Sequence, residues 1–135
     1  MICAWIDTSS AEIGSSQTMK LGPTATTHLA MDPGDRTPDE LIANVRRGLY
    51  VTRFWYVREV HPLRTVITGM TREGTFRIED GRITTPVRDL RFTQSIVGAL
   101  DDVRGISCER RLEVPDEGSA TLAPWLHLGR FHFSS

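Results

Sequence analysis

The sequence has few of the features that mark secreted, membrane or metal-binding proteins. It contains two cysteines, Cys3 and Cys108, which are too few and too far apart for a disulfide framework or a Cys-x-x-Cys metal site. No apolar run approaches the roughly 20 residues of a transmembrane helix, and no basic segment precedes an apolar stretch as in a signal peptide. We therefore expect reduced thiols in a soluble, cytoplasmic protein without a membrane partner.

An excess of charge of either sign is also lacking. The 135 residues carry a formal net charge of -1, and lysine occurs once, at Lys20, so arginine supplies nearly all of the positive charge. Nucleic-acid-binding domains usually present a basic surface field. The balanced charge therefore predicts no direct nucleic-acid partner.

The composition is that of an ordinary globular domain. Hydrophobic residues make up 39% of the chain and charged residues 24%, which argues against wholesale disorder, and the length suits one hydrophobic core. We expect a single β-rich domain over residues 1–135. Because residues 1–6 already have the pattern of a strand, we also expect this domain to be truncated on its N-terminal side.

The histidines do not have the spacing of a zinc site. A metallopeptidase helix places two histidines one turn apart, with a glutamate between them to activate water. The four histidines are His28, His61, His127 and His132, and none is followed by glutamate at the needed spacing. His127 and His132 are five residues apart on an expected strand, which directs them to opposite faces. We expect each histidine to be an ordinary surface or edge residue, with no metal ligand among them.

No other catalytic or cofactor-binding residue is predicted. The serines lack the Gly-x-Ser-x-Gly setting of a nucleophile elbow, and Cys108 is expected to be a buried structural thiol. The pair Asp101 and Asp102 falls at the end of an expected helix, which is typical of a solvated corner. The segment 69–74 has neither phosphate-binding glycine motif.

The clearest local signal is a helix start at Thr37. Thr37-Pro38-Asp39-Glu40 has the pattern of a capping box, with proline at the first helical position. An apolar face follows, and the arginines at 46 and 47 suit the negative end of a helix that Gly48 closes. These features predict a helix over residues 38–47.

The rest of the chain is mostly β-like. Asp80-Gly81 between alternating residues predicts a tight hairpin turn, and apolar residues at helical spacing predict a second helix over 94–103. A short helical turn is expected from Asp7 to Ile13. Strands are expected over 1–6, 24–31, 49–58, 66–72, 76–79, from 83 through 87–92, 105–114 and 125–133, with a turn at 32–35 and a loop at 115–119.

The aromatic run Phe54-Trp55-Tyr56 lies between Arg53 and Arg58. Such a cluster could stack nucleic-acid bases, but the neutral charge and the missing RNA-binding motif favour a packed core. An exposed edge of the same sheet could also bind an extended peptide by strand addition, which requires few particular side chains.

Several motifs together resemble one family. They are Pro33-Gly34-Asp35, Asp39-Glu40-Leu41-Ile42, Gly48–Thr52, Thr71–Phe76, Ile78–Gly81, Pro86-Val87, Pro124-Trp125-Leu126 and Phe131–Ser134. In order and spacing, from about residue 7 to residue 134, the chain resembles the C-terminal region of the TldD/PmbA family, described as modulators of DNA gyrase and as peptide-maturing metallopeptidases. The resemblance implies an α+β fold with a twisted, mainly antiparallel sheet and two short helices.

The resemblance also implies what this chain does not carry. Catalytic members bind zinc through an HExxxH helix upstream of this region and a cysteine in a Cys-Gly-rich segment before the final strand. The matching segment here, residues 115–123, has no cysteine, and Cys108 lies too early to take that role. No catalytic, cofactor-binding or metal residue is therefore transferred, and no cofactor is expected in this chain.

Three hypotheses remain. The first is a non-catalytic PmbA-like domain of a dimeric proteolytic or peptide-maturation complex, which acts on peptides or unfolded proteins and pairs with itself or with a TldD-like subunit. The second is a fragment of an active zinc metallopeptidase whose HExxxH helix lies outside this chain. The third is a stand-alone module that binds extended peptides.

Overall fold

The computed structural model describes residues 2–4, 28–114 and 120–134. These residues confirm the expected α+β fold, with a mainly antiparallel sheet and two short helices. The strands are β1 (Ile2–Ala4), β2 (His28–Ala30), β3 (Arg47–His61), β4 (Val66–Glu79), β5 (Arg82–Pro86), β6 (Arg91–Ser95), β7 (Val103–Glu113), β8 (Ala120–Leu128) and β9 (Phe133–Ser134). The helices are α1 (Pro38–Ala43) and α2 (Ile96–Leu100), and a 3-10 turn, η2, covers Pro62–Arg64.

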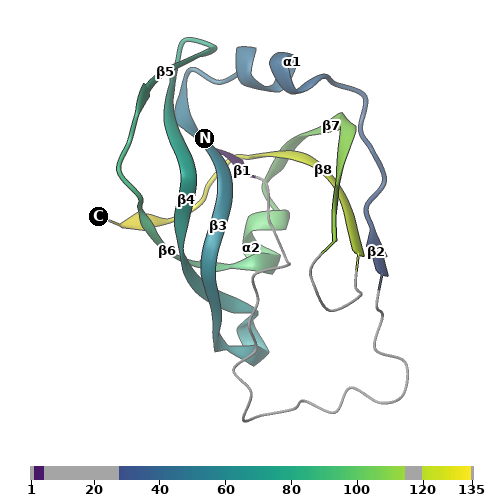
Figure 1. The fold of residues 1–135 in the computed structure, drawn as a ribbon, viewed down its shortest axis with the longest axis vertical. Helices are drawn as coiled ribbons and strands as arrows, with labels where there is room; N and C mark the ends of the chain where they lie inside the picture. Colours follow the sequence, from purple (N-terminus) through teal and green to yellow (C-terminus); the bar gives the residue numbers. More distant parts are fainter. Residues whose placement is uncertain (1, 5–27, 115–119, 135) are drawn as a thin grey trace.

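The strands form two groups joined by β1. The order across the sheet is β2-β8-β1-β3-β4-β6-β9, with β5 paired to β4 and β7 paired to β8. The short β1 is parallel to β3 and antiparallel to β8, and it lies between the two groups in the ribbon (Figure 1). Only β1–β3 and β2–β8 are parallel pairs among the described strands. The sheet is therefore continuous across β1 over three residues only.

Strands β3 and β4 form the longest hairpin of the described chain. They pair from Arg47 opposite Glu79 to His61 opposite Val66, with irregular register at three places. Both strands are longer than the sequence patterns predicted. Strand β4 continues through residues 73–75 by means of a bulge, which joins the two strands expected over 66–72 and 76–79. The expected tight turn after β4 is confirmed: Asp80 and Gly81 have φ values of 46° and 75°, as an Asp-Gly hairpin turn requires.

Helix α1 begins as expected and ends early. The Thr37 amide donates to Glu40 Oε2 at 2.7 Å, and the Glu40 amide donates to Thr37 Oγ1 at 3.2 Å, which completes the capping box. The hydrogen bond from the Thr37 backbone holds the pKa of Glu40 below its ordinary value. The prediction of a helix to residue 47 is wrong, because the carbonyl groups of Val45 and Arg46 accept from the turn after β4 instead.

Helix α2 and the strand before it are also shorter than predicted. Ser95 caps α2 by accepting from the Gly98 amide at 3.2 Å, and Val103 already belongs to β7. Residues 87–90 were expected to continue a strand but form an irregular connection between β5 and β6. The expected helical turn from Asp7 to Ile13 and the start of the strand over 24–31 lie outside the described residues.

The chain after β8 differs most from expectation. A single strand over 125–133 was predicted, but β8 ends at Leu128, where Gly129 passes against α2. The Gly129 amide donates to the Asp102 carbonyl at 2.7 Å, and a Cβ at position 129 would lie 2.4 Å from the Asp102 carboxylate. The chain then turns, and Phe133 pairs with Phe92 of β6. A glycine, at a position where a side chain would clash with the Asp102 carboxylate, therefore separates two strands.

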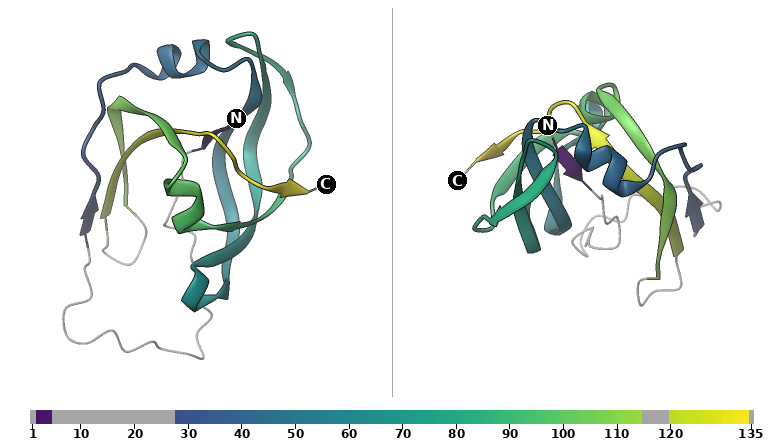
Figure 2. Two further views of the ribbon diagram at one scale, coloured as in Figure 1. Left: turned by 180° about the vertical axis from the view of Figure 1, so that it is seen from behind. Right: turned by 90° about the horizontal axis from the view of Figure 1, so that it is seen from above.

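The aromatic part of the main core lies on the Phe54 face of β3, β4 and β6. Phe54 and Phe92 have ring centroids 4.7 Å apart, and Phe131 stacks on Phe54 at 5.4 Å. Seen from behind, α2 and the chain leading to β9 lie across this face (Figure 2). The buried members of the cluster are Val51, Phe54, Phe92, Ala99, Leu126 and Leu128. The C-terminal segment after Gly129 therefore closes the core.

No helix among the described residues is long and apolar enough to cross a membrane.

Candidate functional site

The described residues do not bring metal ligands together. No group of three or more His, Cys, Asp or Glu side chains that could hold a metal ion occurs in the part of the chain that the structure describes. His28, His61 and His132 are exposed and lie on β2, at the end of β3 and before β9. These three positions agree with the expected surface or edge histidines.

His127 corrects that expectation. Its side chain is 3% exposed, and its Nε2 has no hydrogen-bond partner in the structure. Burial lowers the pKa of His127, and the positive charges of Arg104 and Arg36 act in the same direction. The alternation of β8 places His127 on the face opposite to Leu126 and Leu128, beneath α1. A neutral, buried imidazole is consistent with a structural role.

Cys108 was expected to be buried and is exposed. On β7 it alternates with Ser107, which is fully buried, so the two side chains lie on opposite faces. Ser107 Oγ donates to the Glu109 carbonyl at 2.6 Å and accepts from the Trp125 amide at 2.7 Å. The serine therefore links β7 and β8, while the thiol faces solvent.

The acidic pair after α2 has a structural role. Asp102 Oδ1 lies 2.7 Å from Arg104 Nε, and its other oxygen lies 3.7 Å from Arg130 Nε. Asp101 is exposed at the end of the helix, as predicted. Through these two arginine contacts, Asp102 connects the end of α2 with the chain after β8. The arrangement is that of an ion-paired corner rather than of a general acid–base pair.

The most distinctive surface lies on the face of β3 and β4 opposite to the paired residues Phe54 and Thr71. Along β4, Met70 and Arg72 share this face with their β3 partners Trp55 and Arg53, because directly paired residues lie on the same side. The same register adds Arg58 of β3 and Arg91 of β6. We call this surface the arginine–tryptophan face and define it as Arg53, Trp55, Arg58, Met70, Arg72 and Arg91.

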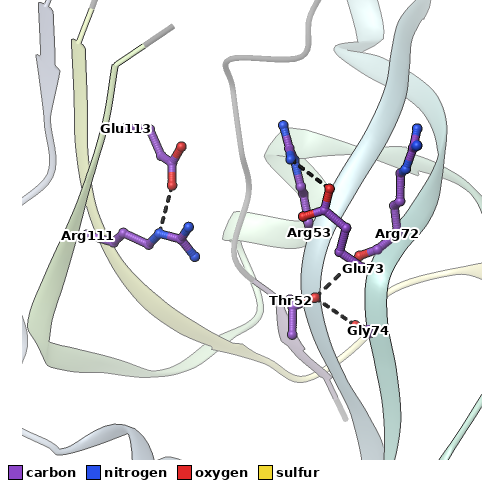
Figure 3. A network of polar contacts seen from close by, with 7 residues as sticks. All are labelled: Thr52, Arg53, Arg72, Glu73, Gly74, Arg111 and Glu113. Carbon is purple, nitrogen blue, oxygen red and sulfur yellow. Dashed lines mark hydrogen bonds and ion pairs between the residues drawn. The ribbon is translucent and has the colours of Figure 1, made fainter.

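Two guanidinium groups lie against the Trp55 ring. The Arg72 Cζ atom is 4.4 Å from the ring centroid and the Arg53 Cζ atom is 5.5 Å from it, within the range of cation–π contacts. Arg53 also pairs with Glu73 at 3.0 Å (Figure 3). The expected packed aromatic core therefore holds for Phe54 alone, because Trp55 is 39% exposed.

Tyr56 repeats this arrangement one residue further along β3. The Arg58 Cζ atom lies 4.0 Å from the Tyr56 ring centroid, and Arg58 also donates to Tyr56 Oη. Tyr56 is 52% exposed. Arginines before and after the aromatic pair thus lie against rings that the sequence pattern alone would have placed in the core.

Two bulges shape the arginine–tryptophan face. Tyr56 has φ 55° on β3 and Glu73 has φ 62° on β4, both in the left-handed region, where non-glycine residues are uncommon. Each accompanies a shift in the β3–β4 register. Thr52 Oγ1 donates to the Gly74 carbonyl at 2.9 Å and contacts the Arg72 carbonyl at 3.3 Å, which holds the β4 bulge (Figure 3). Such bulges redirect side chains at functional sites.

Among the described residues, no strand pairs beyond β1 with the edge of β3 that faces the second group of strands, and we call this part the open edge. Strand β1 pairs with residues 49–51 only, and no described strand pairs with that edge of β3 from Trp55 to His61. Figure 3 shows β3 at Thr52 and Arg53, with the pair Arg111–Glu113 of β7 (2.7 Å) on the other group of strands. Unpaired backbone groups at a sheet edge can accept an extended chain.

Comparison with known proteins identifies the relatives of this chain. The family model of the PmbA/TldA metallopeptidase C-terminal domain matches residues 7–135. A protein named "Metalloprotease" from Methanothermobacter thermautotrophicus is 32% identical over 84 residues, which are 62% of this chain and 18% of that protein. The chain thus spans about a fifth of the length of this curated relative.

Three solved structures share the fold. TldE from Thermococcus kodakarensis superposes with a TM-score of 0.67 at 15% identity, over 78% of this chain and 23% of that chain. A candidate modulator of a DNA gyrase from Thermotoga maritima gives 0.63 at 16% identity, over 79% and 24%. A corresponding protein from Bacteroides thetaiotaomicron gives 0.54 at 23% identity, over 72% and 22%.

Proposed function

Because this chain belongs to the PmbA/TldA metallopeptidase C-terminal domain family, we propose that it is a non-catalytic domain of a dimeric proteolytic complex. In that complex it contributes sheet and interface to a cytoplasmic assembly that acts on peptides or unfolded proteins. The observation that carries the proposal is the family match over nearly the whole chain. A second observation is that the described residues contain no cluster of side chains that could hold a metal ion.

The residues of this chain do not fit the zinc that the metallopeptidase family name implies. The buried histidine, His127, lies among paired strands, and no second and third ligand join it in the described residues. An exposed thiol at Cys108 lies on β7 without a ligand cluster around it. We therefore derive no chemical step from these residues and assign them a role in binding and assembly.

A peptide-binding role within this function is supported by the open edge of β3. Backbone groups between Trp55 and His61 face no described strand, so an extended peptide could pair with them as an additional strand. The same observation favours a second candidate function, a module that binds extended peptides without a partner subunit. The two candidates differ in oligomeric state: the first requires a dimer and the second a monomer that binds peptide.

The experiment that tests the proposal measures metal and assembly in the purified 135-residue chain. After dialysis against a chelator, elemental analysis should find no stoichiometric zinc, and light scattering should find a dimer or a complex with a family member that carries HExxxH. Stoichiometric zinc that survives chelation would contradict the non-catalytic assignment. A monomer that binds extended peptides unaided would favour the second candidate.

The remaining alternative is a fragment of an active zinc peptidase. It predicts that a longer chain, including any upstream HExxxH segment, hydrolyses peptides and loses this activity with a chelator. In that case the 135 residues would still supply binding surface, because their own described side chains form no metal site.

A further inference from the structure

The arginine–tryptophan face carries more positive charge than the acidic side chains of the described residues neutralise. Four of its six members are arginines, and Glu73 is the acidic residue that pairs with one of them, Arg53. Among the ion pairs of the described residues, none includes Arg58, Arg72 or Arg91. A local excess of positive charge therefore lies on a chain whose formal net charge is -1.

The aromatic rings hold the guanidinium groups and leave their donors available. Trp55 has Arg72 at 4.4 Å and Tyr56 has Arg58 at 4.0 Å from the ring centroid. A guanidinium stacked on a ring is partly ordered before a ligand arrives, so it loses less entropy on binding. Its planar set of N–H donors matches a carboxylate in a bidentate manner.

The same contacts argue against nucleic acid as the ligand. Base binding on single strands depends on aromatic faces that are free to stack. On this face, guanidinium groups already lie over Trp55 and Tyr56. Outward-facing guanidinium groups without free rings fit carboxylates better than bases.

The spacing of the arginines suits an extended ligand. Arg58, the pair Arg53–Arg72 and Arg91 lie at successive or neighbouring positions of the β3–β4–β6 register, next to the open edge of β3. Two left-handed residues, Tyr56 and Glu73, are maintained beside them, and such strain is concentrated at binding sites. The positive charge and the position beside the β3 edge therefore both favour an acidic, extended chain as the ligand.

We propose that the arginine–tryptophan face binds an acidic, extended segment of the peptide substrate, with Arg72 and Arg58 donating to its carboxylates. This inference rests on the proposed function, since it names the substrate class of the same peptide-processing assembly. The segment lies across the part of β3 and β4 that no described helix or strand covers, and its backbone is within reach of the β3 edge. Arg91 adds positive charge on the β6 side.

Fluorescence anisotropy of labelled peptides with the purified chain tests this inference. The probe is a short peptide with glutamate at alternate positions, and the comparison peptide has glutamine at the same positions. The acidic peptide should bind more tightly, and its affinity should fall as sodium chloride is raised, because exposed ion pairs are screened. The double variant Arg58→Gln with Arg72→Gln should weaken acidic-peptide binding about tenfold.

A matched control removes the same charge elsewhere. Arg46 and Arg82 are exposed and lie at the α1 end of the molecule, so Arg46→Gln with Arg82→Gln should change the affinity about twofold or less. Equal binding of both peptides, or equal loss in both double variants, would overturn the acidic preference. Either outcome would leave the proposed function intact, because that function is tested separately by the zinc content and the assembly of the chain. Tighter binding of an oligothymidine than of the acidic peptide would also overturn the inference.

Discussion

The two ends of the β3–β4 hairpin differ in what covers their aromatic side chains. At one end, Tyr50 lies beside α1, near Phe76, and stacks on Trp125 with ring centroids 5.5 Å apart. At the other end, Trp55 lies on the same two strands and is exposed among arginines. Both ends are rich in aromatic residues. The difference arises from what packs above them, since α1 covers only the first end.

The comparison teaches that aromatic content on a strand does not by itself predict burial. An aromatic ring covered by a helix contributes mainly through the area it removes from water. A ring covered by guanidinium groups instead orders charged donors while it remains accessible. The covered end therefore stabilises the fold, and the open end is available for binding.

The largest expected effect tests the covered end. Leu41 of α1 is fully buried, so Leu41→Ala should lower the free energy of unfolding by about 2–5 kcal/mol. Trp55→Ala, on the open end, should lower it by roughly 1 kcal/mol or less, because surface substitutions seldom cost more. Urea unfolding followed by circular dichroism measures both. Equal losses would show that the two ends are not energetically distinct.

A smaller effect is expected where α1 begins. Thr37→Ala removes the side chain that accepts from the Glu40 amide, and loss of such a cap costs about 1 kcal/mol. The same unfolding experiment detects it. Thr37→Ser retains the hydroxyl and should be close to the wild type. A neutral Thr37→Ala would mean that the tertiary contacts of α1 hold it without the cap.

A still smaller change, of opposite sign, is expected on the open end. Glu73 has φ 62°, so Glu73→Gly should relieve left-handed strain of about 1 kcal/mol and lose an exposed ion pair worth less than that. The net result should be a slight rise in the thermal midpoint. Glu73→Gln, which loses the ion pair and keeps the strain, is the control. A lower midpoint for the glycine variant would show that the bulge is not strained.

The last prediction concerns the stability of the wild type and of a His127 variant at mildly acidic pH. The pKa of His127 is lowered in the folded state, so below about 6.5 the unfolded chain binds a proton that the folded chain does not. Stability should therefore be complete above that pH and decline as the pH falls toward the folded-state pKa. His127→Gln should flatten this part of the profile. Parallel profiles for the two proteins would contradict a buried, neutral imidazole.

The sequence was sufficient where structure depends on neighbouring residues. The capping box at Thr37 and the Asp80-Gly81 turn act over three or four positions, and both are present as predicted. The family resemblance extended this to the whole fold. The prediction of a helix to residue 47 failed because the carbonyl groups of Val45 and Arg46 accept from amides of the β4–β5 turn, and these groups meet only in the folded chain.

The candidate site was harder to predict because it depends on register. Nothing local indicates that Arg72 lies opposite Arg53, or that both lie against Trp55. The burial of His127 likewise results from α1 packing over a distant strand. One signal was available: the aromatic run 54–56 lies between Arg53 and Arg58, and this pattern suggests base stacking, although the neutral charge favoured a packed aromatic core.

The pairing of β1 with β8 has a consequence for synthesis. Ile2 lies opposite Leu128, so two strands that are almost the full length of the described chain apart must meet before the sheet is continuous. Contacts of such long sequence separation form slowly, because the entropy of closing the intervening loop must be lost first. On the ribosome, β1 therefore cannot pair with β8 until more than a hundred further residues have been synthesised. The β3–β4 hairpin can form earlier, and during that interval an exposed strand edge is open to chaperones.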